Sequence, residues 1–524
     1  VLEAFIAQAL VAHEATSCIT EVMFDDARER ARDLDKLFEK TGRVVGPLHG
    51  VPISVKVYDI KGYDTTIGLA KYINKPAQST ADVKRTNNSI ETPPQLVQSM
   101  ISAGAIPFLK TNIPQTLYSF ECSNPIWGRT SNPYNAEYSS GGSSGGEASM
   151  LALDAAVIGL GSDIAGSLRS PASSCGIYSF KPGVGRISDY GAKESFPGFD
   201  GIKSVCGPMA RCMDDLELAC RVSFGGGRGV APVKFREVKL PEKLRFGYYA
   251  SDGVIKASPA CIRAVHETVG ALERQGHECI ELNQDLTADI FNTYIQLTSA
   301  DGYRTLLKDI GSNEPLDPSL YLLTLLPKVP QIIRNILARV IRTFAGDKAM
   351  SDLMRLGGER TVERYHAACL RRNEIKEEFY RRFWDAYNLD GIITHVHASP
   401  ACSHGRSQKI PLMAGSTCTY NLVDSPCGVV PVTHVKAKTD GITEEWINGP
   451  GRGTSAMTES NLCFSKGKRI YDDVKMDGMP VGVQVVGRLW EDEKVLAMMR
   501  VVDEALGVQR ERGFKPGSWE ERLQ

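Results

Sequence analysis

The feature that most constrains this chain is the stretch from Tyr138 to Ile187, where two serine clusters are embedded in glycine. It reads YSSGGSSGGEASMLALDAAVIGLGSDIAGSLRSPASSCGIYSFKPGVGRI, and its Ser143 and Ser167 lie 24 positions apart. Glycine lets the backbone approach a ligand closely and adopt positive φ. The stretch therefore predicts hydroxyl chemistry next to exposed backbone N–H groups, which is the arrangement that stabilises an oxyanion.

Ser167 has the better setting for a nucleophile. A strand is predicted at 157–161, and the turn from Asp163 to Gly166 follows it. Successive N–H groups of such a turn can converge on one anion. We expect the oxyanion of a tetrahedral intermediate to lie there.

Ser143 offers an alternative, because GGSSG fits the Gly-x-Ser-x-Gly elbow of α/β-hydrolases. Its base would then be a downstream histidine such as His395, His397 or His434. The elbow needs a buried strand directly before the serine. The residues before Ser143 are polar, so we disfavour this interpretation.

The base for Ser167 need not be histidine, since none lies from Gly50 to Val265. Lys56 lies inside VPISVKVY, residues 51–58, which predicts a buried strand. Burial lowers the pKa of a lysine, and a neutral amine can accept a proton from a hydroxyl. Ser143 could relay that proton. A lone strand lysine is usually an edge or snorkelling residue, so the hypothesis depends on the three elements together.

Composition excludes several classes of protein. The 524 residues are 42% hydrophobic and 23% charged, with a net charge of -1, which is typical of a globular enzyme and does not favour a nucleic-acid partner. Thirteen cysteines without a CxxC pair and nine histidines without HExxH predict neither a disulfide scaffold nor a zinc site. No run of about 20 apolar residues could span a bilayer.

The order of predicted elements indicates one continuous α/β domain. Two helices are expected within 1–45, and a strand, a helix and a strand follow each other at 244–249, 258–275 and 279–282. Such alternation favours a parallel or mixed sheet covered by helices. The polar stretches 83–94 and 441–468 are predicted to be loops or insertions.

Four motifs in this order resemble the amidase signature family: PLHGVPISVK, GGSSGG, GLGSDIAGSLRSPASSCGIYSFKP and GMPVGVQVVG. The resemblance extends over nearly the whole chain. It implies a single domain over 1–524, with a twisted mixed β-sheet covered by helices on both faces and its catalytic signature at 138–187. It also implies a Ser–Ser–Lys triad and neither a metal nor an organic cofactor.

The roles of the family carry over position by position. Ser167 matches the nucleophile, and Ser143 matches the bridging serine, whose peptide bond to Gly142 is cis in the family. Lys56 matches the base that later protonates the leaving amine through Ser143.

The loop before the nucleophile is also matched. The N–H groups of Ile164, Ala165, Gly166 and Ser167 match the oxyanion hole, and Asp163 and Arg169 match residues that brace the loop. Many members have glycine where this chain has Ala165. If that position requires positive φ, alanine would be strained there.

Within the family, residues 111–125 and 58–69 resemble the fatty acid amide hydrolase branch, and fungal-type acetamidases share part of the later motifs. Leu117 and Tyr118 fall on acyl-channel positions, although both also suit ordinary core packing. The expected function is serine hydrolysis of fatty acid amides or N-acylethanolamines. A general short-chain amidase and a catalytically silent binding or subunit protein are the alternatives.

The segment 317–344 falls where that branch has a membrane-binding cap. One half of its predicted helix is apolar, and Arg334, Arg339 and Arg342 lie on the other half. This pattern suits peripheral membrane contact, while a helix packed on the core or in a dimer interface is the alternative. We therefore expect an intracellular enzyme, cytoplasmic or peripheral on an internal membrane, and a homodimer stays open. The apolar half comprises Ile332, Ile333, Ile336, Leu337, Val340, Ile341 and Phe344.

Overall fold

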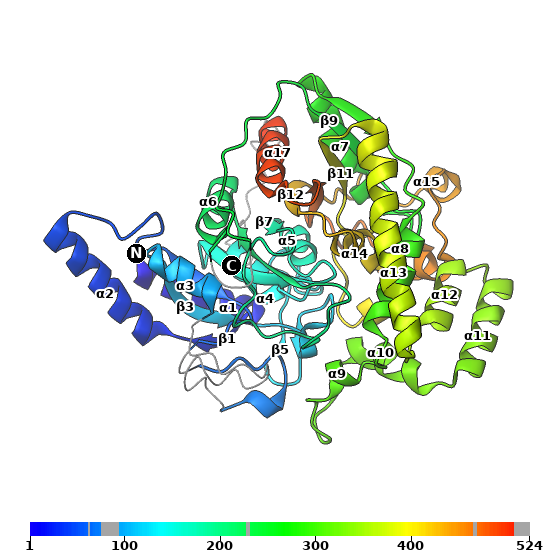
Figure 1. Cartoon of the computed structure of the whole chain (residues 1–524), viewed down its shortest axis with the longest axis horizontal. Coiled ribbons are helices and arrows are strands. Elements are labelled where there is room, and N and C mark those ends of the chain that lie inside the picture. The colour runs from blue at the N-terminus through cyan, green and yellow to red at the C-terminus, as the bar shows by residue number, and fades with distance from the viewer. Residues whose placement is uncertain (61–62, 75–93, 227–230, 465–468, 508–524) are drawn as a thin grey trace.

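An 11-stranded mixed sheet runs through the molecule in the order β1-β3-β2-β6-β8-β7-β12-β13-β11-β9-β10 (Figure 1). The computed structural model describes residues 1–60, 63–74, 94–226, 231–464 and 469–507. The strands are β1 (Ile19–Val22), β2 (Pro52–Val55), β3 (Ile106–Thr111), β6 (Ile158–Asp163), β7 (Tyr178–Lys181), β8 (Val205–Ala210), β9 (Arg245–Tyr249), β10 (Glu278–Glu281), β11 (Gly391–His395), β12 (Cys427–His434) and β13 (Pro480–Val486). A separate pair is formed by β4 (Ser123–Asn124) and β5 (Gly128–Arg129).

Helices cover the sheet along its length. For example, α6 packs on β8, α7 on β11 and β13, and α17 on β12. The helices are α1 (Leu2–Thr16), α2 (Phe24–Thr41), α3 (Gln95–Ser102), α4 (Gly145–Ala152), α5 (Arg169–Cys175), α6 (Met213–Ser223), α7 (Pro259–Arg274), α8 (Thr287–Thr298), α9 (Arg304–Leu307), α10 (Tyr321–Leu325), α11 (Gln331–Phe344), α12 (Lys348–Leu356), α13 (Val362–Phe379), α14 (Gly415–Leu422), α15 (Glu444–Asn448), α16 (Ala456–Glu459) and α17 (Asp492–Ala505).

The central strands are buried on both faces. Every residue of β2, β8 and β13 is buried, which is why these strands read as apolar runs rather than as an alternating pattern. The expected single α/β domain with a mixed sheet is confirmed, and the predicted elements at 244–249, 258–275 and 279–282 correspond to β9, α7 and β10.

Some elements differ from the sequence prediction. The strand β1 has only four residues and lies between two helices, so its pattern is too short to detect. The predicted loop 441–468 contains α15 and α16, which are capped by the side chains of Thr443 and Ser455. Apart from Pro94, the polar stretch 83–94 lies outside the described residues.

Two parallel neighbours position the site. Val55 of β2 is paired with Leu160 of β6, and the Lys56 N–H donates to the Leu160 carbonyl at 3.1 Å. Because both strands run in the same direction, the segments that follow them leave the sheet at one edge. This edge is where open α/β sheets bind their ligands.

In the part of the chain that the structure describes, no helix is both long and apolar enough to cross a bilayer.

Candidate active site

Lys56 lies directly after β2 and is enclosed by protein, with 2% of its surface exposed. Its Nζ donates to Ser143 Oγ at 2.8 Å and to Ser162 Oγ at 3.0 Å. Both partners are neutral hydroxyls. Because burial disfavours the ammonium form, the pKa of Lys56 is lowered to about 8. A lysine with this pKa can supply a neutral amine as a general base at mildly alkaline pH.

Ser143 lies in the glycine-rich loop just before α4. Its side chain is buried, and the peptide bond that joins it to Gly142 is cis, as the resemblance implies. The Oγ of Ser143 accepts the hydrogen bond from Lys56 Nζ inside the protein.

Ser167 lies between β6 and α5, where the turn that follows the strand ends. Its backbone carbonyl accepts from the Ser144 N–H at 3.2 Å, so the two serine clusters are in contact. Among the described residues, no hydrogen bond joins the side chains of Ser143 and Ser167, and no histidine bonds to either. The elbow interpretation is not supported, because the hydroxyl of Ser143 bonds to Lys56.

Asp163 and Arg169 brace the turn before Ser167, and neither side chain is exposed. Two hydrogen bonds of 3.1 Å join the guanidinium to the carboxylate. Burial alone would raise the pKa of Asp163, but the Arg169 charge holds this pKa well below its usual range. The same guanidinium reaches Asn421 on α14 at 2.6 Å and Gln484 on β13 at 3.0 Å. The ion pair therefore fixes the turn to distant parts of the fold.

The N–H groups of this turn do not all face the same partner. The Gly166 N–H donates to Asp163 Oδ1 at 2.8 Å, so it is occupied within the protein. Those of Ile164, Ala165 and Ser167 have no protein acceptor within the described ranges, and these three residues line a cavity. Positive φ falls on Gly166, at 122°, and not on Ala165, so the strain expected at Ala165 does not arise.

A cavity of about 120 Å³ lies beside Ser167. Its walls are mainly apolar and come from the loop that contains Leu117 and Tyr118, from α8, and from the segment 319–326. Tyr118 also packs edge-on against Phe196 at a ring distance of 5.2 Å, so it serves both packing and the cavity. Besides Ile164 and Ala165, the apolar and aromatic lining residues are Leu117, Tyr118, Phe120, Phe291, Tyr294, Ile295, Tyr303, Leu322, Leu323, Leu326, Leu353, Pro411 and Ala414.

The segment 317–344 joins this cavity to the surface. Leu322 and Leu323 on α10 line the cavity, and α11 follows at the edge of the molecule (Figure 1). The apolar half of α11 faces outward, with Ile332 75% exposed and Phe344 85% exposed. A helix packed on the core through this half is therefore excluded within this chain.

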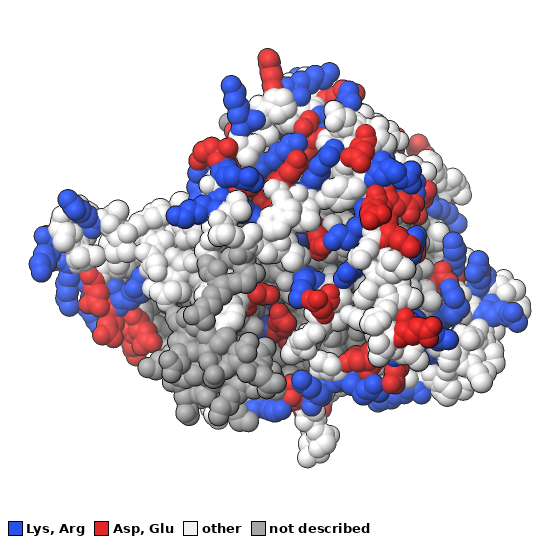
Figure 2. Space-filling model, in the orientation of Figure 1, with Lys and Arg blue, Asp and Glu red and all other residues white. Residues whose placement is uncertain are grey.

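Arg334 departs from the predicted pattern, because its side chain is buried beneath α11 and not on an exposed basic face. Its guanidinium lies against Gly358, which has no side chain to exclude it. Arg339 and Arg342 are exposed as expected. In the space-filling view, blue Lys and Arg residues lie beside white uncharged residues at this edge of the molecule (Figure 2).

Sequence reasoning missed several residues of the site. Ser162 bonds to Lys56 and could have been found, since it lies inside the same motif as Ser167. Phe291 on α8, Leu353 on α12 and Thr417 on α14 gave no signal, because only the tertiary fold brings them to the turn or the cavity.

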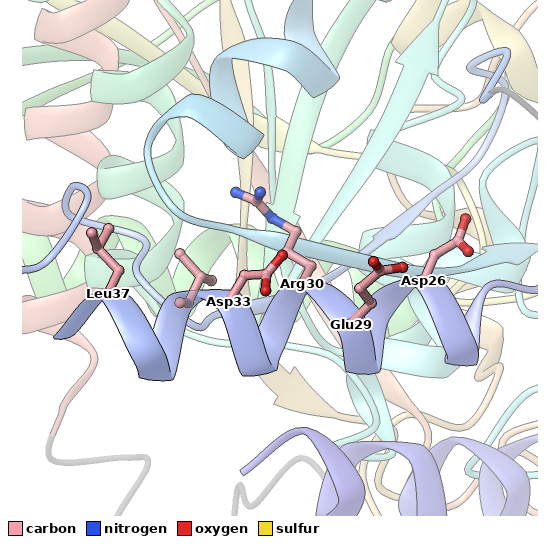
Figure 3. Close-up of a pocket in the computed structure, with 6 residues that line it drawn as sticks. Asp26, Glu29, Arg30, Asp33 and Leu37 are labelled. Atoms are coloured by element: carbon pink, nitrogen blue, oxygen red, sulfur yellow. The ribbon is translucent and has the colours of Figure 1, made fainter. Parts of the chain in front are cut away.

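A second hollow lies along α2 and shares no lining residue with the cavity beside Ser167 (Figure 3). It is lined by Asp26, Glu29, Arg30, Asp33, Leu34 and Leu37. Arg30 points toward the body of the protein and donates to the Ala105 carbonyl at 2.7 Å. The hollow contains no nucleophile, and it plays no part in the site.

Comparisons with known proteins identify the family of this chain. The family model described as Amidase matches residues 1–496, and the chain belongs to this amidase signature family of amidohydrolases. It is 32% identical to Amidase 1 of Gibberella moniliformis, over 97% of this chain and 89% of that protein. It is 31% identical to fatty-acid amide hydrolase 1 of Sus scrofa, over 98% and 83%.

Among solved structures, a fatty acid amide hydrolase superposes with a TM-score of 0.80 at 27% identity. The match covers 97% of this chain and 82% of that one. The expected family and amidohydrolase activity are thus confirmed.

Proposed function

We propose that this chain is a serine amidase that hydrolyses fatty acid amides or N-acylethanolamines through an acyl-enzyme on Ser167. The observation that carries the proposal is the 2.8 Å hydrogen bond from the buried Lys56 to Ser143. It lies at the same sheet edge as Ser167, which opens on an apolar cavity.

Acylation begins with the neutral amine of Lys56. It accepts the Ser143 proton while Ser143 accepts the proton of Ser167, whose Oγ attacks the amide carbon. The carbonyl oxygen becomes an oxyanion, which the free N–H groups of Ile164, Ala165 and Ser167 stabilise.

The C–N bond breaks in the next step. The ammonium of Lys56 returns its proton through Ser143 to the leaving nitrogen, and the amine departs. Water then attacks the ester carbon of the acyl-enzyme, and the fatty acid leaves as Ser167 regains its proton.

The lipid substrate is supported by the walls of the cavity and by its surroundings. A long acyl chain would fill the apolar space formed by α8, α10 and α12. The exposed apolar half of α11 adjoins α10, which suits contact with a membrane from which such a substrate enters. The proposal therefore includes peripheral binding to an internal membrane.

The substrate class is tested by hydrolysis of oleamide, N-arachidonoylethanolamine, hexanamide and acetamide, with Ser167→Ala as the blank. Higher kcat/KM for the two long chains supports the lipid amidase. Preference for hexanamide or acetamide would instead support the general short-chain amidase.

A catalytically silent protein on this fold is the second alternative. A fluorophosphonate probe should label wild-type Ser167 covalently, because the probe needs an activated serine. Absence of labelling in a folded wild-type protein would support the silent alternative.

Membrane binding is tested on α11 by vesicle co-sedimentation. We expect the double variant Ile336→Asp/Val340→Asp to lose binding, because both side chains are about half exposed on the apolar half. The matched control Asn335→Asp/Thr343→Asp adds the same charge at exposed polar positions of the same helix. Equal loss in both variants would assign the effect to charge alone. Unchanged binding, together with a change from dimer to monomer in sedimentation velocity, would assign the face to a homodimer.

A further inference from the structure

The peptide unit between Ala165 and Gly166 is held at both ends. Its N–H donates to Asp163 Oδ1 at 2.8 Å, and its carbonyl oxygen accepts from Thr417 Oγ1 at 2.5 Å. The N–H groups on either side, those of Ala165 and Ser167, belong to residues that line the cavity. In this orientation, both polar groups of the peptide unit bond to the protein, and the N–H groups of Ala165 and Ser167 stay available to a ligand.

Thr417 reaches the turn from α14, which lies 252 positions further along the chain. Its hydroxyl has a single proton and two carbonyl acceptors, Ala165 at 2.5 Å and Ala414 at 3.1 Å. The shorter contact assigns the proton to Ala165. The Nε2 of His397 lies 3.5 Å from the same hydroxyl. Burial lowers the pKa of His397 to about 3, so this ring is neutral across the working pH range.

The approach of Thr417 depends on the glycine at 166. A Cβ built on Gly166 would come within 2.6 Å of Thr417 Oγ1 and 2.7 Å of its Cβ. The φ of 122° at Gly166 is also one that only glycine adopts without strain. Glycine at this position thus permits two things, the turn itself and the contact with Thr417.

We propose that Thr417 is a positioning residue for amide hydrolysis, which holds the Ala165 carbonyl away from the reacting oxygen. If this peptide unit rotated, a carbonyl oxygen would face the oxyanion where N–H groups are needed, and repulsion would replace stabilisation. Glycine-containing turns have little intrinsic resistance to such rotation. The hydroxyl of Thr417 supplies that resistance from outside the turn. This inference rests on the proposed acyl transfer at Ser167.

The test compares Thr417→Val, which keeps the shape but removes the hydroxyl, with Thr417→Ser, which keeps the hydroxyl. For oleamide, we expect kcat to fall about tenfold to a hundredfold in the valine variant, with KM within about twofold. The serine variant should recover most of the loss. A trifluoromethyl ketone with the oleoyl chain forms an oxyanion on Ser167, so its affinity should fall in parallel with kcat/KM. The affinity for oleic acid, which forms no such adduct, should not change.

The outcomes separate this inference from the proposed function. If the wild-type protein neither hydrolyses oleamide nor reacts with a fluorophosphonate, the proposed function fails. If wild type is active and the valine variant equals it in kcat and ketone affinity, Thr417 does not position the turn. Equal loss of ketone and oleic acid affinity, or no recovery by serine, would also overturn the inference. Circular dichroism checks folding, and Thr417→Ala replaces the valine variant if the latter does not fold.

Discussion

The amine of Lys56 lies in the protein interior, and its pKa of about 8 leads to a defined pH dependence. Below this pKa the ammonium form cannot accept the proton of Ser143, whereas above it the neutral amine can. We predict that kcat/KM rises with pH through an acid limb near 8. In Lys56→Ala the plateau above pH 8 should be lost, and a weak activity should rise with pH without levelling off because hydroxide replaces the base. Profiles between pH 6 and 10 measure this, and full activity in the variant would contradict the triad.

The same residue is predicted to lower stability. In the unfolded chain Lys56 titrates near its ordinary pKa of 10.5, and in the folded protein near 8. Folding therefore releases a proton between these values, so the cost of burying the charge is complete below pH 8 and absent above 10.5. We expect Lys56→Met to raise the unfolding free energy at pH 7 by about 3 kcal/mol.

Urea unfolding at pH 7 and at pH 10.5 measures this difference. The increase in unfolding free energy caused by Lys56→Met should fall toward zero at the higher pH. A gain that is the same at both values would mean that the charge is not its cause.

Single residues of the site could be predicted where their neighbours in the sequence reveal their role. Lys56 was recognisable as a lysine within an apolar strand, and Ser167 as a serine after a strand and a glycine turn. Thr417 was not, because an isolated threonine on a helix has no pattern that reveals a carbonyl 252 positions away. Nor could the sequence show which N–H groups of the turn are occupied, since that depends on the side chain of Asp163.

At the scale of elements, substitutions in α10 should change the preference of the enzyme for the length of the substrate's acyl chain. Leu323 lines the cavity, and Leu325, two positions further, is 60% exposed. We predict that Leu323→Trp lowers kcat/KM for oleamide relative to hexanamide by about tenfold or more, because the larger side chain occupies acyl space. Leu325→Trp should leave the ratio unchanged. Equal ratios in both variants would mean that the acyl chain does not pass α10.

For helix α11, the amphipathic pattern of the sequence predicts only part of the structure. Its apolar half was visible in the sequence, but the pattern could not say which half faces the protein. In the structure the buried positions are Arg334 and Ala338, one turn apart. Ala338 lets the helix lie close, and Arg334 rests against a glycine, which is a packing detail without a periodic signature.

At the scale of the molecule, the order of the strands in the sheet differs from their order in the chain. The late strands β12 and β13 lie between β7 and β11, and β12 pairs directly with β7. The sheet is therefore incomplete without the late strands β12 and β13, and these strands have only each other as neighbours without β7 and β11. We predict one cooperative unfolding transition in urea, coincident by far-UV circular dichroism and tryptophan fluorescence, despite the length of 524 residues. Separate midpoints would show that the sheet divides into independent units.

The position of β12 also has a consequence during synthesis. The edge of β7 at Tyr178–Lys181 has no partner until Cys427–His434 has left the ribosome. About 250 residues are translated in between, which takes roughly 12–50 seconds at typical rates. An unpaired strand edge is prone to associate with other chains during that time. Production in a heterologous host should therefore depend on chaperones that bind nascent chains and on slow, cool induction more than on the stability of the finished enzyme.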